Sequence, residues 1–211
     1  MTSTRAAIVE VSLLEPAEAV VQQAVSVLAA GGVVAFPTDT LYGLGCGYGQ
    51  KQAIERIQTM RGLDLATRPL TFLLPDLGEL PRFTRMSESG YRMVNRILPG
   101  PYCVELLAHP NVPSPFVQGE RRTIGVRIPQ SALCEKLTWR LGRPILTATA
   151  KSRDGHVLTT AAEIRQEYGT QLDLILDGGT LSGPPSTVVS LVDDWVTVLR
   201  EGLGPANRLT G

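Results

Sequence analysis

Hydrophobic positions along the chain alternate between helical and strand-like spacing. After Pro16, apolar residues recur at intervals of three and four, and Gly31 and Gly32 end this amphipathic pattern, which predicts a helix. The continuously apolar run 33–36 then predicts a short buried strand that stops at Pro37. Further helices are predicted over 52–60, 87–98, 132–141 and 160–168, and further strands over 70–74, 102–107, 123–128, 145–149 and 172–177. Such alternation is typical of an α/β domain.

The last two apolar runs, 187–192 and 196–199, are separated by a short acidic segment, Asp193-Asp194-Trp195. Two strands joined so tightly predict an antiparallel hairpin, and therefore a mixed sheet. The chain has no internal repeat, low-complexity segment or long Gly/Ser linker. We therefore expect one compact α/β domain over residues 1–211.

Composition narrows the possible classes of protein. Hydrophobic residues make up 43% of the chain, enough for a sizeable core, which excludes global disorder. Lysine plus arginine and aspartate plus glutamate both number 20, so bulk charge does not favour nucleic acid, although a local basic patch remains compatible with this balance. Three scattered cysteines and two histidines lack metal-ligand spacing, and no apolar run approaches the ~18 residues of a membrane span. We expect a reduced, cytoplasmic protein without a structural metal or a membrane partner.

The segment 36–49 has the densest chemical signal. It contains Thr38, Asp39 and Thr40, followed by glycines at every second position from Gly43 to Gly49. Glycines let backbone N–H groups approach a ligand closely, and threonine hydroxyls are directed donors. The spacing matches neither a Walker loop nor the GxGxxG fingerprint. Two interpretations stay open: a ligand-binding glycine-rich loop, or a simple turn after a strand.

This segment also carries a family resemblance. Residues 31–45, GGVVAFPTDTLYGLG, resemble the opening motif of the YrdC-like domain family, and the remaining motifs follow in order between residues 16 and 204. They are 68–70 (RPL), 98–101 (LPGP), 123–129 (TIGVRIP), 177–179 (DGG), 185–189 (PSTVV) and 199–202 (LREG). The family includes threonylcarbamoyl-adenylate synthases and a YciO-type branch. The stretch 121–129 makes this chain more similar to the YciO-type branch.

The resemblance implies a twisted mixed sheet with flanking helices and a basic concave cavity. Synthase members join L-threonine, bicarbonate and ATP, and the product serves modification of an adenosine in tRNA. For this chain the resemblance implies ATP or AMP as ligand, with L-threonine, bicarbonate and tRNA or double-stranded RNA as further candidate partners. Mg²⁺ is expected to accompany ATP, because the phosphates need a counter-charge.

Individual positions inherit roles from the family motifs. The resemblance implies substrate binding by Thr40, Arg127, Ser186 and Thr187, and nucleotide binding by Arg61, Arg68, Thr149, Lys151 and Arg200. Simpler interpretations stand beside these. Arg127 is alternatively a strand-end ion pair, the Ser186-Thr187 hydroxyls ordinary strand-start caps, and Arg200 a structural residue.

Several family positions are changed in this chain. The family's K-x-R motif after the second helix corresponds to residues 59–64, which contain no lysine. A family histidine is replaced by Leu73, and a family threonine by Cys103. The family's S-x-N motif corresponds to residues 149–151, where Lys151 replaces the asparagine. These losses favour two alternatives to a synthase. One is a protein that binds a nucleotide or double-stranded RNA, and the other is a hydrolase acting on threonylcarbamoylated adenosine. One stretch contains four arginines with interleaved aromatic residues. It is either a candidate RNA-binding surface or simply a solvated helix face. Its residues are Arg82, Phe83, Arg85, Tyr91, Arg92 and Arg96.

Overall fold

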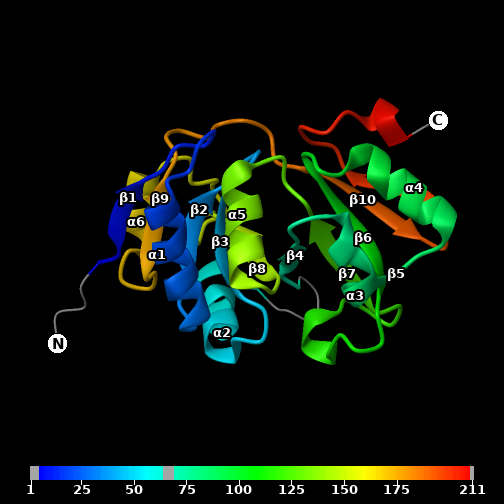
Figure 1. Cartoon of the computed structure of the whole chain (residues 1–211), viewed down its shortest axis with the longest axis horizontal. Coiled ribbons are helices and arrows are strands. Elements are labelled where there is room, and N and C mark those ends of the chain that lie inside the picture. The colour runs from blue at the N-terminus through cyan, green and yellow to red at the C-terminus, as the bar shows by residue number, and fades with distance from the viewer. Residues whose placement is uncertain (1–4, 64–68, 210–211) are drawn as a thin grey trace.

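The structure, a computed structural model, describes residues 5–63 and 69–209, and helices alternate with strands along it (Figure 1). The strands are β1 (Ala7–Glu10), β2 (Val34–Pro37), β3 (Tyr42–Gly47), β4 (Thr71–Leu73), β5 (Thr84–Arg85), β6 (Tyr102–Ala108), β7 (Thr123–Arg127), β8 (Ile145–Thr149), β9 (Leu174–Asp177), β10 (Thr187–Val192) and β11 (Trp195–Arg200). The α-helices are α1 (Glu18–Ala29), α2 (Lys51–Arg61), α3 (Leu80–Phe83), α4 (Glu88–Ile97), α5 (Ala132–Leu141) and α6 (Ala161–Tyr168). Short 3-10 turns are η1 (Leu77–Glu79), η2 (Ser114–Phe116) and η3 (Ala206–Leu209).

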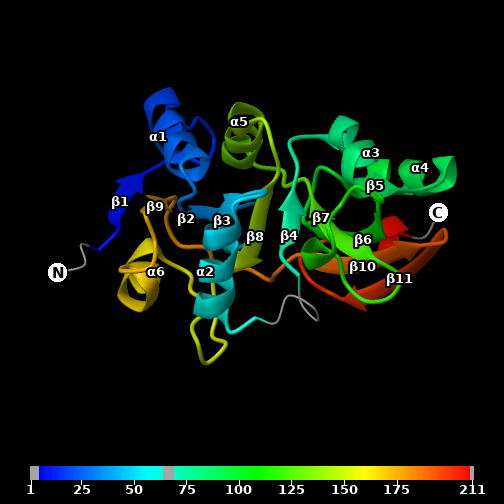
Figure 2. The same ribbon diagram turned by 90° about the horizontal axis from the view of Figure 1, so that it is seen from below.

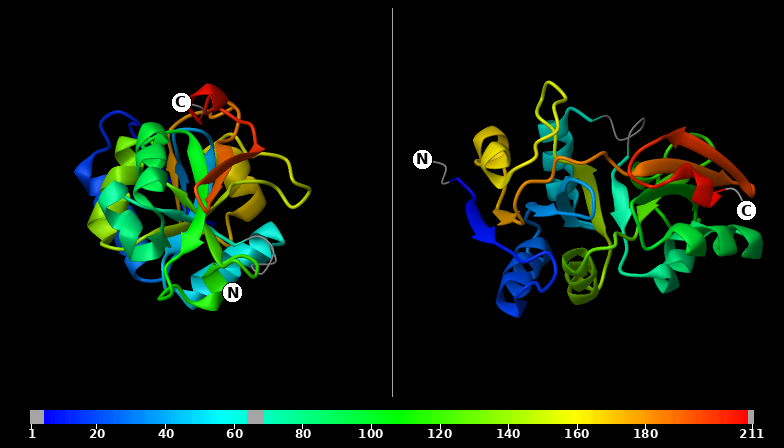
Figure 3. Two further views of the ribbon diagram at one scale, coloured as in Figure 1. Left: turned by 90° about the vertical axis from the view of Figure 1, so that its right-hand side faces the viewer. Right: turned by 90° about the horizontal axis from the view of Figure 1, so that it is seen from above.

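All the strands belong to one mixed sheet in the order β1-β9-β2-β3-β8-β4-β7-β6-β10-β11, with β5 paired to β6 beside this path. Parallel pairs such as β1–β9, β4–β7 and β6–β10 alternate with antiparallel pairs such as β2–β3 and β3–β8. The predicted hairpin is confirmed, since β10 and β11 pair antiparallel. Seen from above, β1 and η3 lie at opposite ends of the twisted sheet (Figure 3). The predicted mixed α/β fold is therefore confirmed.

Helices cover the two faces of the sheet unequally. On one face, α1 and α5 pack over β2, β9 and the beginning of β8. On the other face, α2 and α6 lie under the same strands (Figure 2). The helices α3 and α4 belong to that second cluster, where they bury β6 and β7. Beyond α5, the first face is therefore not covered by any of the described helices.

Helix ends follow local side-chain chemistry. Ser87 begins α4 by accepting a hydrogen bond from the Gly90 N–H, as predicted. Thr160 and Glu163 form a reciprocal capping box at the start of α6. Gly142 ends α5 in the left-handed conformation, where a side chain would be strained. The longest described helix has 12 residues, and none is both long and apolar enough to cross a membrane.

The structure corrects the sequence prediction for the glycine-rich segment. Residues Tyr42–Gly47 form the buried strand β3, not a loop or turn. A Cβ on Gly45 would lie 2.6 Å from Cε1 of Phe36, so this glycine makes room for an aromatic ring of the core. The short edge strand β1, whose four residues pair in parallel with β9, was also missed.

Candidate ligand-binding cavity

A cavity of about 360 Å³ lies on the sheet face that α1 and α5 leave open. Six neighbouring strands each contribute one small residue to its floor: Gly43 (β3), Thr147 (β8), Thr71 (β4), Gly125 (β7), Cys103 (β6) and Val188 (β10). Farther along β8, Ile145 on the same face is buried in the cluster under α1 and α5. Small side chains across adjacent strands, together with the missing helix cover, produce the hollow.

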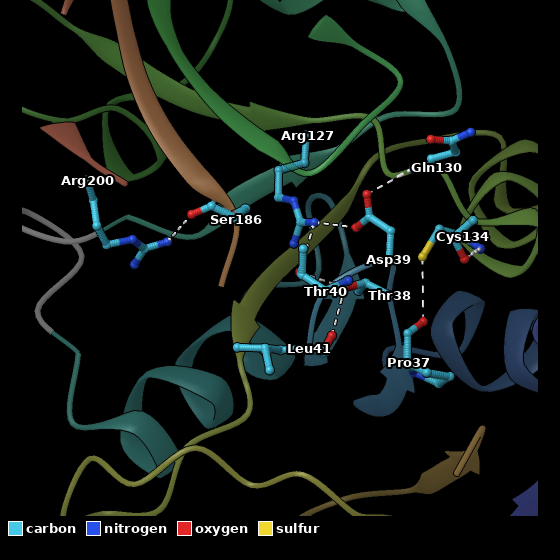
Figure 4. A network of polar contacts seen from close by, with 11 residues as sticks. Pro37, Thr38, Asp39, Thr40, Leu41, Arg127, Gln130, Cys134, Ser186 and Arg200 are labelled. Atoms are coloured by element: carbon cyan, nitrogen blue, oxygen red, sulfur yellow. Dashed lines mark hydrogen bonds and ion pairs between the residues drawn. The ribbon is translucent and has the colours of Figure 1, made fainter. Parts of the chain in front are cut away.

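Arg127, the last residue of β7, lines the cavity from the middle of the contributing strands. Its Nη2 donates to Oδ1 of Asp39 at 2.5 Å and to Oγ1 of Thr40 at 3.2 Å (Figure 4). The second oxygen of Asp39 accepts from the N–H of Gln130, just before α5, at 3.1 Å. Both charged side chains are largely buried, with exposed fractions of 12% for Arg127 and 8% for Asp39. This ion pair joins the turn after β2 to the end of β7.

Thr40 and Arg127, both predicted to bind substrate, are in direct contact, but among the described residues Arg127 lines the cavity and Thr40 does not. The alternative, a strand-end ion pair, is present as well, through Asp39. Nε of Arg127 is buried and has no hydrogen-bond partner among the described residues. Arg127 lines the cavity, so the guanidinium that pairs with Asp39 also borders the space open to a ligand. Arg127 therefore has both a structural partner and a place on the cavity wall.

Ser186 and Arg200 line the cavity at its β10–β11 side. Nη2 of Arg200, at the end of β11, donates to the backbone oxygen of Ser186 at 2.7 Å (Figure 4). Both residues line the cavity. Thr187 does not: it is fully buried, donates to the oxygen of Gly204 at 2.6 Å and accepts from the N–H of Gly202 at 3.0 Å. The contacts of Thr187 therefore agree with the alternative interpretation, in which its hydroxyl caps the start of a strand.

The remaining predicted nucleotide-binding residues are divided in the structure. Thr149 lines the cavity. Arg61 donates instead to the backbone oxygens of Thr149, Lys151 and Ser152, at 3.0, 3.1 and 3.3 Å, and so ties the end of α2 to the segment after β8. Neither Arg61 nor Lys151 is among the described lining residues. Arg68 lies outside the described residues.

Sequence reasoning missed Glu105, which lines the cavity from the middle of β6. Its Oε1 accepts a hydrogen bond from Oγ1 of Thr123 at 2.6 Å. A usable signal was present, because the strand reads YCVELLA and places its one charged residue on the same face as Cys103. The charged lining among described residues is thus Arg127, Arg200 and Glu105.

Thiol and phenol groups near the cavity are held in their neutral forms. Burial raises the pKa of Cys103, against the opposing effect of the Arg127 and Arg200 charges. Burial also raises the pKa of Tyr42 to about 12, and its hydroxyl donates to the oxygen of Gly179 at 2.7 Å. Cys46, interpreted from sequence as a small packed residue, is buried, and its pKa is raised to about 12 by that burial. Within 5–63 and 69–209, no group of three or more His, Cys, Asp or Glu side chains could hold a metal ion.

Fold and site together define an α/β protein with a cavity lined by two arginines. The family model for Sua5, YciO and YrdC proteins, described as "Telomere recombination", matches residues 26–202. The chain is also 36% identical over 191 residues to the Escherichia coli K12 protein named "Uncharacterized protein YciO", covering 90% of this chain and 92% of that one. This chain belongs to the Sua5/YciO/YrdC family, as its motifs predicted.

Solved structures give the same result. The crystal structure of E. coli YciO matches with a TM-score of 0.91 at 32% identity, covering 97% of this chain and 99% of that chain. The crystal structure of P. abyssi Sua5 complexed with L-threonine matches with a TM-score of 0.83 at 28% identity, covering 93% of this chain and 57% of that one. The threonylcarbamoyl-AMP synthase of Bacillus subtilis is 31% identical over 184 residues, which cover 86% of this chain and 53% of that protein. The family thus includes threonylcarbamoyl-AMP synthases.

Proposed function

We propose that the cavity binds an adenine nucleotide together with L-threonine or its carbamoyl derivative. The observation that carries this proposal is the pair of arginines that line the cavity from two different strands. Arg127 and Arg200 lie on β7 and β11, which are separated by β6 and β10. Three strand spacings place their backbones about 14 Å apart. Such a separation suits a ligand with a carboxylate at one end and a phosphate at the other.

Each arginine offers chemistry that fits its assigned group. On the β7 side, the guanidinium of Arg127 lines the cavity and would bind the carboxylate of threonine. On the β11 side, the guanidinium of Arg200 beside Ser186 would bind the phosphate. The L-threonine complex of P. abyssi Sua5 supports an amino-acid ligand in a protein of this fold.

Mg²⁺ would enter with the phosphates of ATP. Glu105 is the only carboxylate among the described lining residues, and one carboxylate with substrate phosphates is a common Mg²⁺ environment. The free thiols of the described chain fit a reducing, cytoplasmic setting, which is part of the same proposal. tRNA is the proposed macromolecular partner, because threonylcarbamoyl-AMP serves the modification of a tRNA adenosine.

Missing family groups should weaken synthesis more than binding. Residues 59–64 contain no lysine, and Cys103 stands at a threonine position of the family motif. Each lost hydrogen bond or charge contributes ~1–3 kcal/mol, and three or four such losses lower a rate by several powers of ten. We therefore propose binding of the nucleotide as the retained property, with slow adenylate synthesis.

Thermal unfolding with and without ligand tests the proposal. AMP, or ATP with Mg²⁺, at about 100 times its Kd should stabilise the fold by ~2.7 kcal/mol and raise Tm by several degrees. Arg200→Ala should abolish this shift. The matched control, Arg140→Ala, should keep it, because Arg140 is exposed on α5 and pairs with Glu18. An unchanged Tm at millimolar nucleotide would overturn the proposal.

A second measurement separates a synthase from a binding protein. Pyrophosphate release from ATP is compared with L-threonine and bicarbonate present, and with threonine omitted. Release that depends on threonine supports synthesis. Nucleotide binding without such release supports the alternatives, a binding protein or a hydrolase of threonylcarbamoylated adenosine. Hydrolase activity is measured as loss of the threonylcarbamoyl group from modified tRNA.

A further inference from the structure

Glu105 lies between the two arginines of the cavity when the strands are followed in register. Cys103 on β6 pairs with Val188 on β10, and Val188 pairs with Arg200 on β11. One step along the same face of β6, Glu105 pairs with Gly125 of β7 on one side and with Ser190 of β10 on the other. Its carboxylate thus projects from the next row of side chains, between the two arginine-bearing strands.

The position of this carboxylate is defined by its neighbours. Oε1 accepts from the hydroxyl of Thr123 at 2.6 Å, while the facing residue Gly125 has no side chain to cover it. The hydrogen bond given for Glu105 among the described residues uses Oε1, and the residue is half-buried. The burial of charge without a counter-ion beside it is costly, so a residue of this kind strongly affects which ligand binds.

The charge balance of the described site leaves little attraction for a polyphosphate. Arg127 is already neutralised by Asp39 at 2.5 Å. Arg200 is the other cation of the described lining, and Glu105 offsets it. A single phosphate at Arg200 matches one guanidinium, whereas β- and γ-phosphates that extend into the cavity meet the Glu105 carboxylate.

We propose that Glu105 is a specificity-determining residue that makes the cavity select an adenine nucleotide with one phosphate, free or esterified, over a nucleoside triphosphate. This inference rests on the proposed nucleotide binding. The Glu105 carboxylate also favours a ligand that places an N–H or O–H donor beside its phosphate, because a carboxylate repels anions and accepts hydrogen bonds from donors. The preferred ligand class is therefore an adenylate, the product side of the family reaction, more than ATP.

Direct titration of AMP, ADP and ATP by calorimetry tests this selectivity, first without Mg²⁺. The natural protein should bind AMP at least as tightly as ATP. Glu105→Gln keeps the shape and the acceptor for Thr123 but removes the charge. The variant should bind ATP about tenfold more tightly, because repulsion by a like charge several ångströms away in a partly buried site lowers affinity by at least that factor. AMP affinity should change less than about threefold.

Three controls separate charge from shape and folding. Glu88→Gln removes a carboxylate that is 96% exposed on α4, and should leave both affinities unchanged. Thr123→Val removes the hydrogen bond to Glu105 but keeps the Glu105 charge, so the affinity for ATP should stay low. Glu105→Val places a β-branched residue in the strand and should tighten ATP as Glu105→Gln does, which guards against a folding defect of either variant. Mg²⁺ should narrow the difference between AMP and ATP, because it neutralises the added phosphates.

The outcomes are distinguishable. If no nucleotide binds the natural protein, the proposed function fails, and this inference fails with it. If nucleotides bind, but Glu105→Gln increases the affinities for AMP and ATP equally or changes neither affinity, the proposed function stands and the role of Glu105 is overturned.

Discussion

Arg127 and Asp39 form a nearly buried ion pair, with Nη2 and Oδ1 2.5 Å apart. Removing one partner of such a pair leaves an uncompensated charge and costs about 3–5 kcal/mol. Arg127→Ala should therefore lose both stability and carboxylate binding. Asp39→Asn should lose stability but leave the cavity more cationic, so anion affinity should hold or rise. Urea unfolding and ligand titration of both variants measure this; an Arg127→Ala protein of full stability would show that the pair is not structural.

Gly45 should tolerate no side chain. An added Cβ would meet Cε1 of Phe36 at 2.6 Å and Cγ2 of Ile145 at 2.8 Å, inside a packed core. Overpacking of this kind costs typically ~1–3 kcal/mol, so Gly45→Ala should lower the free energy of unfolding by that amount. Gly183→Ala is the matched control, because nothing lies within 4 Å of its added Cβ. Equal stability of the two variants in denaturant titrations would contradict the packing argument.

Arg61 should behave as a structural residue. Its guanidinium binds the backbone oxygens of Thr149, Lys151 and Ser152, and Arg61→Ala would leave these acceptors without their donor. We expect a lower Tm, while the increase in Tm on adding nucleotide stays near that of the natural protein. A variant with unchanged Tm that no longer responds to nucleotide would support the family-derived role in nucleotide binding instead.

Stability should fall at alkaline pH through the buried thiols. Burial raises the pKa of Cys46 and of Cys134 from about 9 to about 12. Below pH 9 both thiols are protonated whether the chain is folded or not. Between pH 9 and 12 the unfolded chain loses these protons and the folded one keeps them, so the free energy of unfolding decreases with pH. Urea titrations at pH 8 and pH 10 should show a smaller decrease for Cys46→Ala/Cys134→Ala than for the natural protein.

RNA binding through the arginine stretch stays a prediction. Arg82 pairs with Glu79 at 2.6 Å and Arg92 with Glu88 at 3.8 Å, so acidic neighbours dilute this surface. If about four phosphates are neutralised, the log–log salt slope for single strands should be about −3, and Arg92→Ala/Arg96→Ala should reduce it by roughly 1.4. Filter binding of tRNA and of double-stranded RNA across salt concentrations measures the slope. Binding that ignores salt or both substitutions would place any RNA surface elsewhere.

Local patterning was enough to predict most of the elements. The helix after Pro16 and the helix capped by Ser87 were found because helical spacing and cap residues lie within a few positions of one another. The glycine-rich segment was misinterpreted because glycine is ambiguous from sequence. It suits a loop, but it also suits a strand on which a large ring such as that of Phe36 is packed.

The candidate site was predicted less completely. Of the residues predicted from family motifs, Arg127, Thr149, Ser186 and Arg200 line the cavity, whereas Thr40 contacts Arg127 without lining it. Glu105 matched no motif, and so its charge within an apolar strand went unused. Arg61 was assigned to the ligand because a cation near a motif position looks the same in sequence whether it binds phosphate or backbone carbonyls.

By itself, the sequence determined the alternation of helices and strands, the mixed sheet and the family, because these depend on spacing over a few residues and on ordered motifs. Only the tertiary structure decided that Arg127 is paired to Asp39, 88 positions away, and that Glu105 lies between two arginines from different strands. Those relationships depend on strand order and register, and a shift of one residue in register would turn Glu105 to the opposite face of the sheet. The chemistry of the cavity is set by long-range pairing that short-range patterns do not contain.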